Sequence, residues 1–251
     1  MANITVIGIG PGNLEDMTPR ARKAIEHAQV VAGYHTYIKL VESLLDGKEV
    51  IGTGMMQEID RCRMAVEKAA AGQETVDVSS GDAGVYGMAG LVLELVLQRP
   101  KEQRPGCGGT IAGVSAGNAA ASVLGAPLMH DFAVIILSNL LTPWELIERR
   151  VDMAAEGDFV LALYNPKSKK RVENIERVRE ILLKYRDPQT PVGIVTAATR
   201  PDEKKVLSTL ADFTKEDINM FSLVIIGNSQ TYVKEGWMIT PRGYGNKEAG
   251  L

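Results

Sequence analysis

Three glycine-rich segments hold the residues that could bring a ligand against the protein backbone. They are Gly8–Gly12, Ser80–Gly84 and Gly113–Gly117, and each follows a short apolar run typical of a buried strand. Glycine has no Cβ, so a glycine backbone can approach a ligand closely. If the runs are neighbouring parallel strands, the segments meet at the carboxyl edge of one sheet, where open α/β sheets bind ligands. The sequence therefore predicts a binding floor made of backbone.

The first of these segments does not fit a dinucleotide site. Position 13 is Asn13, where the Gly-x-Gly-x-x-Gly pattern needs its third glycine, and Pro11 has no amide hydrogen to donate. The next strand ends Ala32-Gly33-Tyr34-His35, without the acid that would hold ribose hydroxyls. These features argue against an NAD site and against the common Rossmann-like methyltransferases. Taken alone, the segment could also be a tight strand-to-helix connection without a ligand.

Few side chains are suited to proton transfer, and none has the spacing of a catalytic triad or of a metal site. His27 falls in a helix pattern, which favours a solvated or packed role. His35, beside Tyr34, follows the second strand, and His130 lies in the linker between the predicted domains. Asp82 could act on a ligand or could cap the helix that follows it.

Composition excludes several classes of protein. The 251 residues are 45% hydrophobic and 24% charged, with 28 Lys and Arg against 31 Asp and Glu, which is ordinary globular composition without a basic nucleic-acid module. The first apolar run stops at Pro11, too early for a signal peptide or a spanning helix. Cys62 and Cys107 form no Cys-x-x-Cys pair. We therefore expect a cytoplasmic protein that has no metal and binds neither nucleic acid nor membrane.

Short apolar strands alternate with amphipathic helices, which predicts two α/β domains. We place an N-terminal domain with a parallel sheet at residues 1–127. We place a C-terminal domain with a mixed sheet at residues 128–251, since residues 205–210 resemble an edge strand of a hairpin. Residues 98–109 are expected to form an exposed loop. The expected strands are 4–9, 29–33, 75–79, 110–114, 132–137, 159–163, 192–195, 205–210 and 223–226, and the expected helices are 18–28, 58–71, 85–97, 116–124, one from residue 143, and 172–184.

The glycine-rich segments resemble those of the tetrapyrrole methylases. Gly8–Gly12 with Met17-Thr18 is similar to the opening motif of this family, and Gly81-Asp82 and Val114–Ala116 are similar to its two later turns. The resemblance extends over nearly the whole chain. It implies two α/β domains with the cofactor cleft between them, S-adenosylmethionine as methyl donor, S-adenosylhomocysteine as product, a tetrapyrrole substrate and a cytoplasmic homodimer.

Longer motifs are similar to one branch of this family, whose members methylate C17 of a cobalamin precursor and contract its ring. These motifs are Ser80–Ala89, Leu124–Leu128, His130–Ala133, Leu140–Trp144, Leu163–Pro166, Ile225–Ser229 and Thr240–Tyr244. The chain departs from the family at Thr196-Ala197, where relatives often carry Arg-Asn or Lys-Asn. Both metal-free and cobalt-containing substrates fit these motifs.

The resemblance implies the residues that hold the cofactor, and the chemistry of the implied reaction suggests residues for the substrate and for catalysis. Methyl transfer from a sulfonium mainly requires alignment of donor and acceptor, whereas ring contraction requires proton transfer. A basic run can orient the carboxylates of the substrate, although such a run is usually the solvated start of a helix. The residues expected at the cofactor are Pro11, Gly81, Asp82, Val85, Ser115, Ala116, Asn165 and Ala198; those at the substrate are Tyr34, Lys169, Lys170 and Arg171; and the catalytic candidates are His35, Asp82 and His130.

Two alternative functions stay open at this point. A related methylase could act on another ring carbon or on an acceptor that is not a tetrapyrrole. A non-catalytic nucleotide-binding module could use the same glycine-rich turns.

Overall fold

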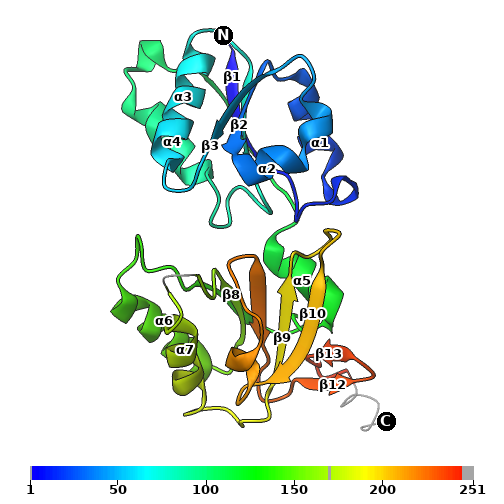
Figure 1. Cartoon of the computed structure of the whole chain (residues 1–251). Coiled ribbons are helices and arrows are strands. Elements are labelled where there is room, and N and C mark those ends of the chain that lie inside the picture. The colour runs from blue at the N-terminus through cyan, green and yellow to red at the C-terminus, as the bar shows by residue number, and fades with distance from the viewer. Residues whose placement is uncertain (1, 169–170, 245–251) are drawn as a thin grey trace. The chain divides into compact units, whose positions relative to one another are not determined.

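The computed structural model describes residues 2–168 and 171–244, which form two compact units that divide after Ala116 (Figure 1). We call residues up to Ala116 unit 1 and residues from Gly117 unit 2. This division falls after the first residue of helix α5 (Ala116–Leu124), whereas the predicted boundary followed residue 127. The reason is packing: Leu124 fills the space above Gly193, and the Gly117 amide donates to the Tyr164 hydroxyl at 2.7 Å.

Unit 1 contains a five-stranded sheet in the order β3-β2-β4-β1-β5, and all its strand pairs are parallel, as predicted. β-Branched and apolar residues make its central strands, which are buried on both faces. Strand β3 was not expected, and β5 begins inside the segment 98–109 that we predicted to be a loop. The strands are β1 (Asn3–Gly8), β2 (Val30–Tyr34), β3 (Glu49–Thr53), β4 (Thr75–Ser79) and β5 (Gly106–Ile111).

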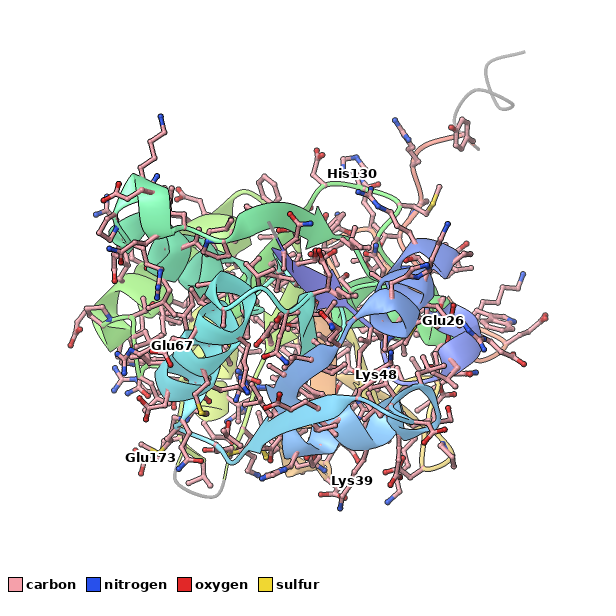
Figure 2. The ribbon with its side chains drawn as sticks, turned by 90° about the horizontal axis from the view of Figure 1, so that it is seen from above. Glu26, Lys39, Lys48, Glu67, His130 and Glu173 are labelled. Atoms are coloured by element: carbon pink, nitrogen blue, oxygen red, sulfur yellow. The ribbon has the colours of Figure 1, made fainter. Side chains whose placement is uncertain are left out.

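Helices cover both faces of this sheet (Figure 1). Helices α1 (Pro19–His27) and α2 (His35–Leu40) pack on one face, and α3 (Glu58–Ala70) and α4 (Ala89–Gln98) pack on the other. Thr18 caps α1 as predicted, since its hydroxyl accepts from the Ala21 amide at 3.1 Å. At the other end of α1, Lys48 donates to the carbonyls of Glu26 and Ala28. Figure 2 labels Lys48 and Glu26 among the side chains of unit 1.

Unit 2 contains the predicted mixed sheet, in the order β10-β9-β11-β8-β7, in which only β7 and β8 pair in parallel. Its main core lies between this sheet and helices α6 (Trp144–Glu156) and α7 (Asn174–Leu182). A small third sheet, β12-β13-β6, was not predicted. The strands are β6 (Gly125–Ala126), β7 (Phe132–Ile136), β8 (Val160–Tyr164), β9 (Pro191–Thr196), β10 (Lys204–Thr209), β11 (Ser222–Ile226), β12 (Tyr232–Lys234) and β13 (Trp237–Ile239).

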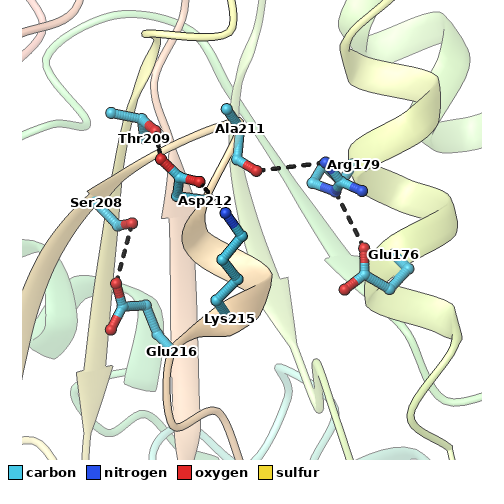
Figure 3. Close-up of polar contacts among 8 residues, drawn as sticks. All are labelled: Glu176, Arg179, Ser208, Thr209, Ala211, Asp212, Lys215 and Glu216. Carbon is cyan, nitrogen blue, oxygen red and sulfur yellow. Dashed lines mark hydrogen bonds and ion pairs between the residues drawn. The ribbon is translucent and has the colours of Figure 1, made fainter.

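Polar contacts join the edge strand β10 to helix α7 through a short 3-10 turn. Arg179 of α7 donates to the Ala211 carbonyl and pairs with Glu176, while Lys215 pairs with Asp212 (Figure 3). These contacts fix the end of β10, which is the edge of the sheet. The 3-10 turns among the described residues are η1 (Leu14–Asp16), η2 (Glu42–Leu44), η3 (Lys101–Gln103) and η4 (Phe213–Lys215).

A buried polar cluster lies between strand β4 and helix α3 of unit 1. Asp77, in β4, is fully buried, and one of its carboxylate oxygens has no hydrogen-bond partner among the described residues. The thiol of Cys62 lies 3.8 Å from its other oxygen, and Arg61 donates to the Thr53 hydroxyl. Burial raises the pKa of Asp77 to about 7, although the nearby charge of Arg61 acts in the opposite direction. Burial also raises the pKa of Cys62 to about 12, so this thiol is not a nucleophile at neutral pH.

This cluster predicts an unusual dependence of stability on pH. Because the folded chain holds the Asp77 proton longer than the unfolded chain does, the stability from this group falls as pH rises from its ordinary pKa of 3.8 to about 7. Asp77→Asn should therefore lose less stability than the wild type between about pH 5 and about pH 8. Urea denaturation at both pH values measures the difference.

The matched control for this prediction is Asp212→Asn. The hydrogen bond from Lys215 lowers the pKa of the exposed Asp212. Its contribution to stability is therefore lost at acid pH, and Asp212→Asn should leave the loss between about pH 5 and about pH 8 unchanged. An identical pH dependence in Asp77→Asn and the wild type would contradict the assignment.

Candidate functional site

The structure brings the three glycine-rich segments of unit 1 together at the carboxyl edge of its sheet. Gly8 ends β1, Gly81 follows β4, and Gly113 follows β5. A Cβ atom built on Gly8 would lie 2.6 Å from the Gly81 carbonyl oxygen and 2.7 Å from the Gly113 nitrogen. Gly10 and Gly81 also exchange two backbone hydrogen bonds of 3.1 and 2.7 Å. We call this contact of Gly8, Gly10, Gly81 and Gly113 the glycine floor; any larger residue at its centre would separate the turns.

The Asp82 carboxylate links two of the turns that form the glycine floor. One carboxylate oxygen accepts from the Gly84 amide at 2.7 Å, and the other accepts from the Gly113 amide at 3.0 Å. The alternative role as a helix cap is wrong, because α4 begins at Ala89 and its N-cap residue, Met88, makes no side-chain cap bond. The two amides orient the carboxylate across the turns. A catalytic role for Asp82 stays a prediction.

The other residues of unit 1 predicted at the cofactor lie around the floor. Gly81 has a left-handed φ of +70°, and its missing Cβ would meet the Ala116 nitrogen at 3.3 Å and the Ser115 Cα at 3.7 Å. Pro11 follows Gly10 directly, and Val85 is exposed in the turn that leads to α4. The structure therefore groups Gly81, Ser115 and Ala116 closely and leaves Val85 at the surface of the same turn.

Tyr34 and His35 lie at the same sheet edge as the glycine floor. Tyr34 ends β2, which pairs with β4, and His35 is the first residue of α2. The His35 side chain is exposed, and its Nδ1 occupies the space that a Cβ on Gly52 of β3 would need, at 2.7 Å. The rings of Tyr34 and Tyr37 pack edge to face, with their centroids 5.2 Å apart. The predicted position of His35 after the second strand is confirmed, whereas α2 and its neighbour β3 were missed.

In unit 2, Asn165 and Ala198 lie at one edge of the mixed sheet. They follow β8 and β9, which run in the same direction because both are antiparallel to β11. The backbone here is strained: Asn165, Ala197 and Thr199 have φ values of 47°, 53° and 63°. Such left-handed residues cluster at functional sites. The departure from the family therefore falls on a strained turn, where asparagine is better tolerated than alanine.

Two described residues of the basic run contact each other at this edge of unit 2, and we call Lys167, Ser168 and Arg171 the basic cluster. Ser168 and Arg171 exchange two backbone hydrogen bonds of 3.2 Å, and Arg171 Nε donates to the Ser168 hydroxyl at 3.2 Å. Arg171 Nη1 is buried without a hydrogen-bond partner in the described part of the chain. Helix α7 begins only at Asn174, so Arg171 is not part of a helix start. Lys169 and Lys170 lie outside the described residues.

His130 lies apart from the other predicted site residues of unit 2. It precedes β7, so it lies at the amino edge of the mixed sheet, opposite the edge that carries Asn165 and Ala198. Its Nδ1 accepts the Asp131 amide at 2.9 Å, and with Asp131 and Arg242 it lines a cavity of about 420 Å³. The sequence could not reveal this separation without the direction of the strands.

Residues 2–168 and 171–244 contain no group of three or more His, Cys, Asp or Glu side chains placed to hold a metal ion. No helix among them is long and apolar enough to cross a membrane.

Comparison with known proteins agrees with the motifs. Residues 3–214 match the profile of the family described as tetrapyrrole (corrin/porphyrin) methylases. The chain is 51% identical to a probable cobalt-factor III C(17)-methyltransferase of Salmonella typhimurium, over 96% of this chain and 99% of that protein. It is 49% identical to the cobalt-factor III methyltransferase of Priestia megaterium over 97% of this chain, which spans only 45% of that relative. The crystal structure of the methyltransferase CobJ superimposes with a TM-score of 0.90 and 36% identity, covering 96% of this chain and 100% of the CobJ chain.

Proposed function

The chain belongs to the tetrapyrrole methylase family, and from this premise we propose that it methylates C17 of cobalt-factor III and contracts the ring in cobalamin biosynthesis, with S-adenosylmethionine as donor. The observation that carries the proposal is the glycine floor, because three turns meet there backbone to backbone at a ligand-binding sheet edge. The cobalt-containing substrate is favoured over metal-free precorrin-3B, since relatives of 49% and 51% identity are named for cobalt-factor III.

The glycine floor suits a donor that must be aligned and need not be activated. Methyl transfer from a sulfonium is a displacement in which positive charge disperses, so the protein must hold donor and acceptor in line and exclude water. Gly81, Ser115 and Ala116 present backbone at the floor, where a larger side chain would block a close approach. Asn165 and Ala198, at the carboxyl edge of β8 and β9, are proposed as further cofactor-binding residues.

Arg171 and Tyr34 are proposed to bind the macrocycle, together with Lys169 and Lys170. The support for Arg171 is its buried Nη1, whose hydrogen-bonding capacity no described residue uses. A guanidinium matches a carboxylate in geometry and charge, and tetrapyrrole precursors carry carboxylates around the ring. Tyr34 is supported by its place at the end of β2, beside the strand that leads into the floor.

His35 is the proposed proton-transfer residue for ring contraction. It is exposed at the same edge as the floor, and histidine exchanges protons readily near neutral pH. Asp82 is less suitable, because two backbone amides engage its oxygens. His130 is the weakest candidate, because it lies at the opposite edge of its sheet from Asn165 and Ala198.

A homodimer in the cytoplasm completes the proposal. The exposed side chains of Tyr232, Val233 and Trp237 on the third sheet offer apolar surface for a second copy. Cys62 and Cys107 are both free thiols, which favours a reducing compartment.

The cofactor assignment predicts a selective binding profile. Calorimetry on the full chain should show binding of S-adenosylhomocysteine and no binding of NAD or ATP, because the floor lacks the third glycine and the ribose-binding acid of a dinucleotide site. Tight binding of ATP or NAD without S-adenosylhomocysteine would favour the alternative of a nucleotide-binding module.

A further inference from the structure

Two adjacent leucines of unit 2 have strongly exposed side chains. Leu140 is 70% exposed and Leu141 is 99% exposed, in the connection between β7 and α6. Full exposure of a leucine forgoes the stabilisation that burial would give, and neighbouring exposed apolar residues commonly mark a binding surface. We call Leu140 and Leu141 the leucine pair.

The connection that carries the leucine pair is anchored at both ends. Before the pair, the buried Leu137 donates its amide to the Tyr164 carbonyl at 2.9 Å and accepts from the Asn174 side chain at 2.9 Å. After the pair, Trp144 packs against the main core at the start of α6. The leucine pair is therefore presented at a fixed place, between two points that belong to the folded core.

The same contacts place the leucine pair at the sheet edge that carries the basic cluster. Because β7 and β8 are parallel neighbours, their carboxyl ends share one edge of the sheet. The connection after β8 carries Lys167 and Arg171, and it returns to Leu137 through Asn174. This edge therefore combines an apolar projection with positive charge. The complementary ligand is a large apolar surface that carries negative groups on its rim.

We propose that the leucine pair binds the apolar face of the tetrapyrrole macrocycle while Lys167 and Arg171 bind its carboxylates. This inference rests on the proposed function and adds a positioning element to it. A flat conjugated ring with carboxylates at its periphery matches both parts of this edge. Its apolar face fits the leucine pair, and its negative charges fit the cations. The leucine pair sets how firmly the ring is held and leaves the binding of the donor unchanged.

The test is a titration of cobalt-factor III, followed by its absorbance, into the wild type and into Leu140→Asn/Leu141→Asn. The double variant should bind the macrocycle at least tenfold more weakly, because two leucines lose their apolar contact with it. Its affinity for S-adenosylhomocysteine and its melting temperature should match the wild type, since both side chains are exposed. The single variant Leu141→Met keeps an apolar side chain at this position and leaves Leu140 intact. It should bind the macrocycle nearly as tightly as the wild type.

Met153→Asn is the matched control, because Met153 is 60% exposed near the end of α6, which leads into the amino end of β8, whereas the basic cluster follows the carboxyl end of that strand. It should bind the macrocycle as the wild type does. Wild-type affinity in the double variant overturns the inference. So does a double variant that becomes monomeric with unchanged affinity, which would assign the pair to a second copy. A wild type that binds the macrocycle but does not methylate it contradicts the proposed function, while the comparison of affinities still decides the role of the leucine pair.

Discussion

Gly113→Ala is expected to weaken the binding of S-adenosylhomocysteine at least tenfold and to destabilise unit 1. The new Cβ would lie 2.2 Å from the Gly81 carbonyl oxygen and 2.7 Å from the Gly8 carbonyl carbon. Both are backbone atoms, so no side chain can rotate away and the turns must separate. Overpacking of this kind costs about 1–3 kcal/mol. Loss of the bond from the Gly113 amide to Asp82 would add about 1–3 kcal/mol, because it leaves a polar group unsatisfied.

Calorimetry with S-adenosylhomocysteine and thermal denaturation measure both effects. Gly90→Ala is the control, because a Cβ there meets nothing within 4 Å and alanine favours the helix α4 by about 0.5–1 kcal/mol. It should bind S-adenosylhomocysteine normally and be at least as stable as the wild type. If Gly113→Ala does not fold, Gly81→Ala is the milder variant, since its closest backbone contact is 3.3 Å and its cost is mainly the strain of alanine at a left-handed φ of +70°. Normal affinity in a folded variant of the floor would show that the donor binds elsewhere.

His35→Ala is expected to slow ring contraction by about 10²–10⁴-fold, the usual contribution of a general acid or base. Methyl transfer should continue, because displacement at a sulfonium depends on alignment and needs no strong base. A methylated macrocycle with an uncontracted ring should then accumulate, and its absorbance spectrum, which follows the conjugation of the ring, measures its amount. If contraction and methylation are concerted, the variant should stall before either.

The controls for this prediction separate chemistry from packing. His27→Ala should have no effect, because His27 is exposed on α1 and its Nδ1 contacts the Lys23 carbonyl of the same helix. His35→Gln retains a polar side chain beside Gly52 but cannot titrate, so it should resemble His35→Ala in rate. Normal product at a normal rate in both His35 variants would show that His35 transfers no proton in the reaction and has only a structural role. Asp82 would then be the next candidate, because it lies at the same sheet edge.

The sequence predicts the glycine floor because parallel strands end at a common edge. The apolar runs before Gly8, Ser80 and Gly113 mark strands, so their following turns had to meet if the strands were neighbours. The bond from Gly113 to Asp82 joins residues 31 positions apart and depends on the strand order, which periodicity does not contain. Strand β3 was missed for a related reason: it is an edge strand whose residues are half-buried or exposed, so it shows no buried apolar run.

In unit 2, the mixed sheet was predictable because residues 205–210 have the pattern of an edge hairpin. The position of His130 was not predicted, since proximity to a motif in sequence does not fix the sheet edge on which a residue lies. The left-handed backbone of Ala197 and Thr199 was also missed, because neither residue type signals a positive φ. The identity of donor and acceptor came from the resemblance of motifs and from the relatives, whereas the geometry explains how a site poor in titratable groups can transfer a methyl group.

The most direct test of the proposed function is an anaerobic incubation of the full chain with cobalt-factor III and S-adenosylmethionine labelled in its methyl group. Mass spectrometry and NMR of the product locate the label. We predict labelled macrocycle with the methyl group on C17, formed together with an equal amount of S-adenosylhomocysteine. Label on another ring carbon would identify a related methylase, and a macrocycle recovered without label while S-adenosylhomocysteine binds normally would contradict the proposed reaction.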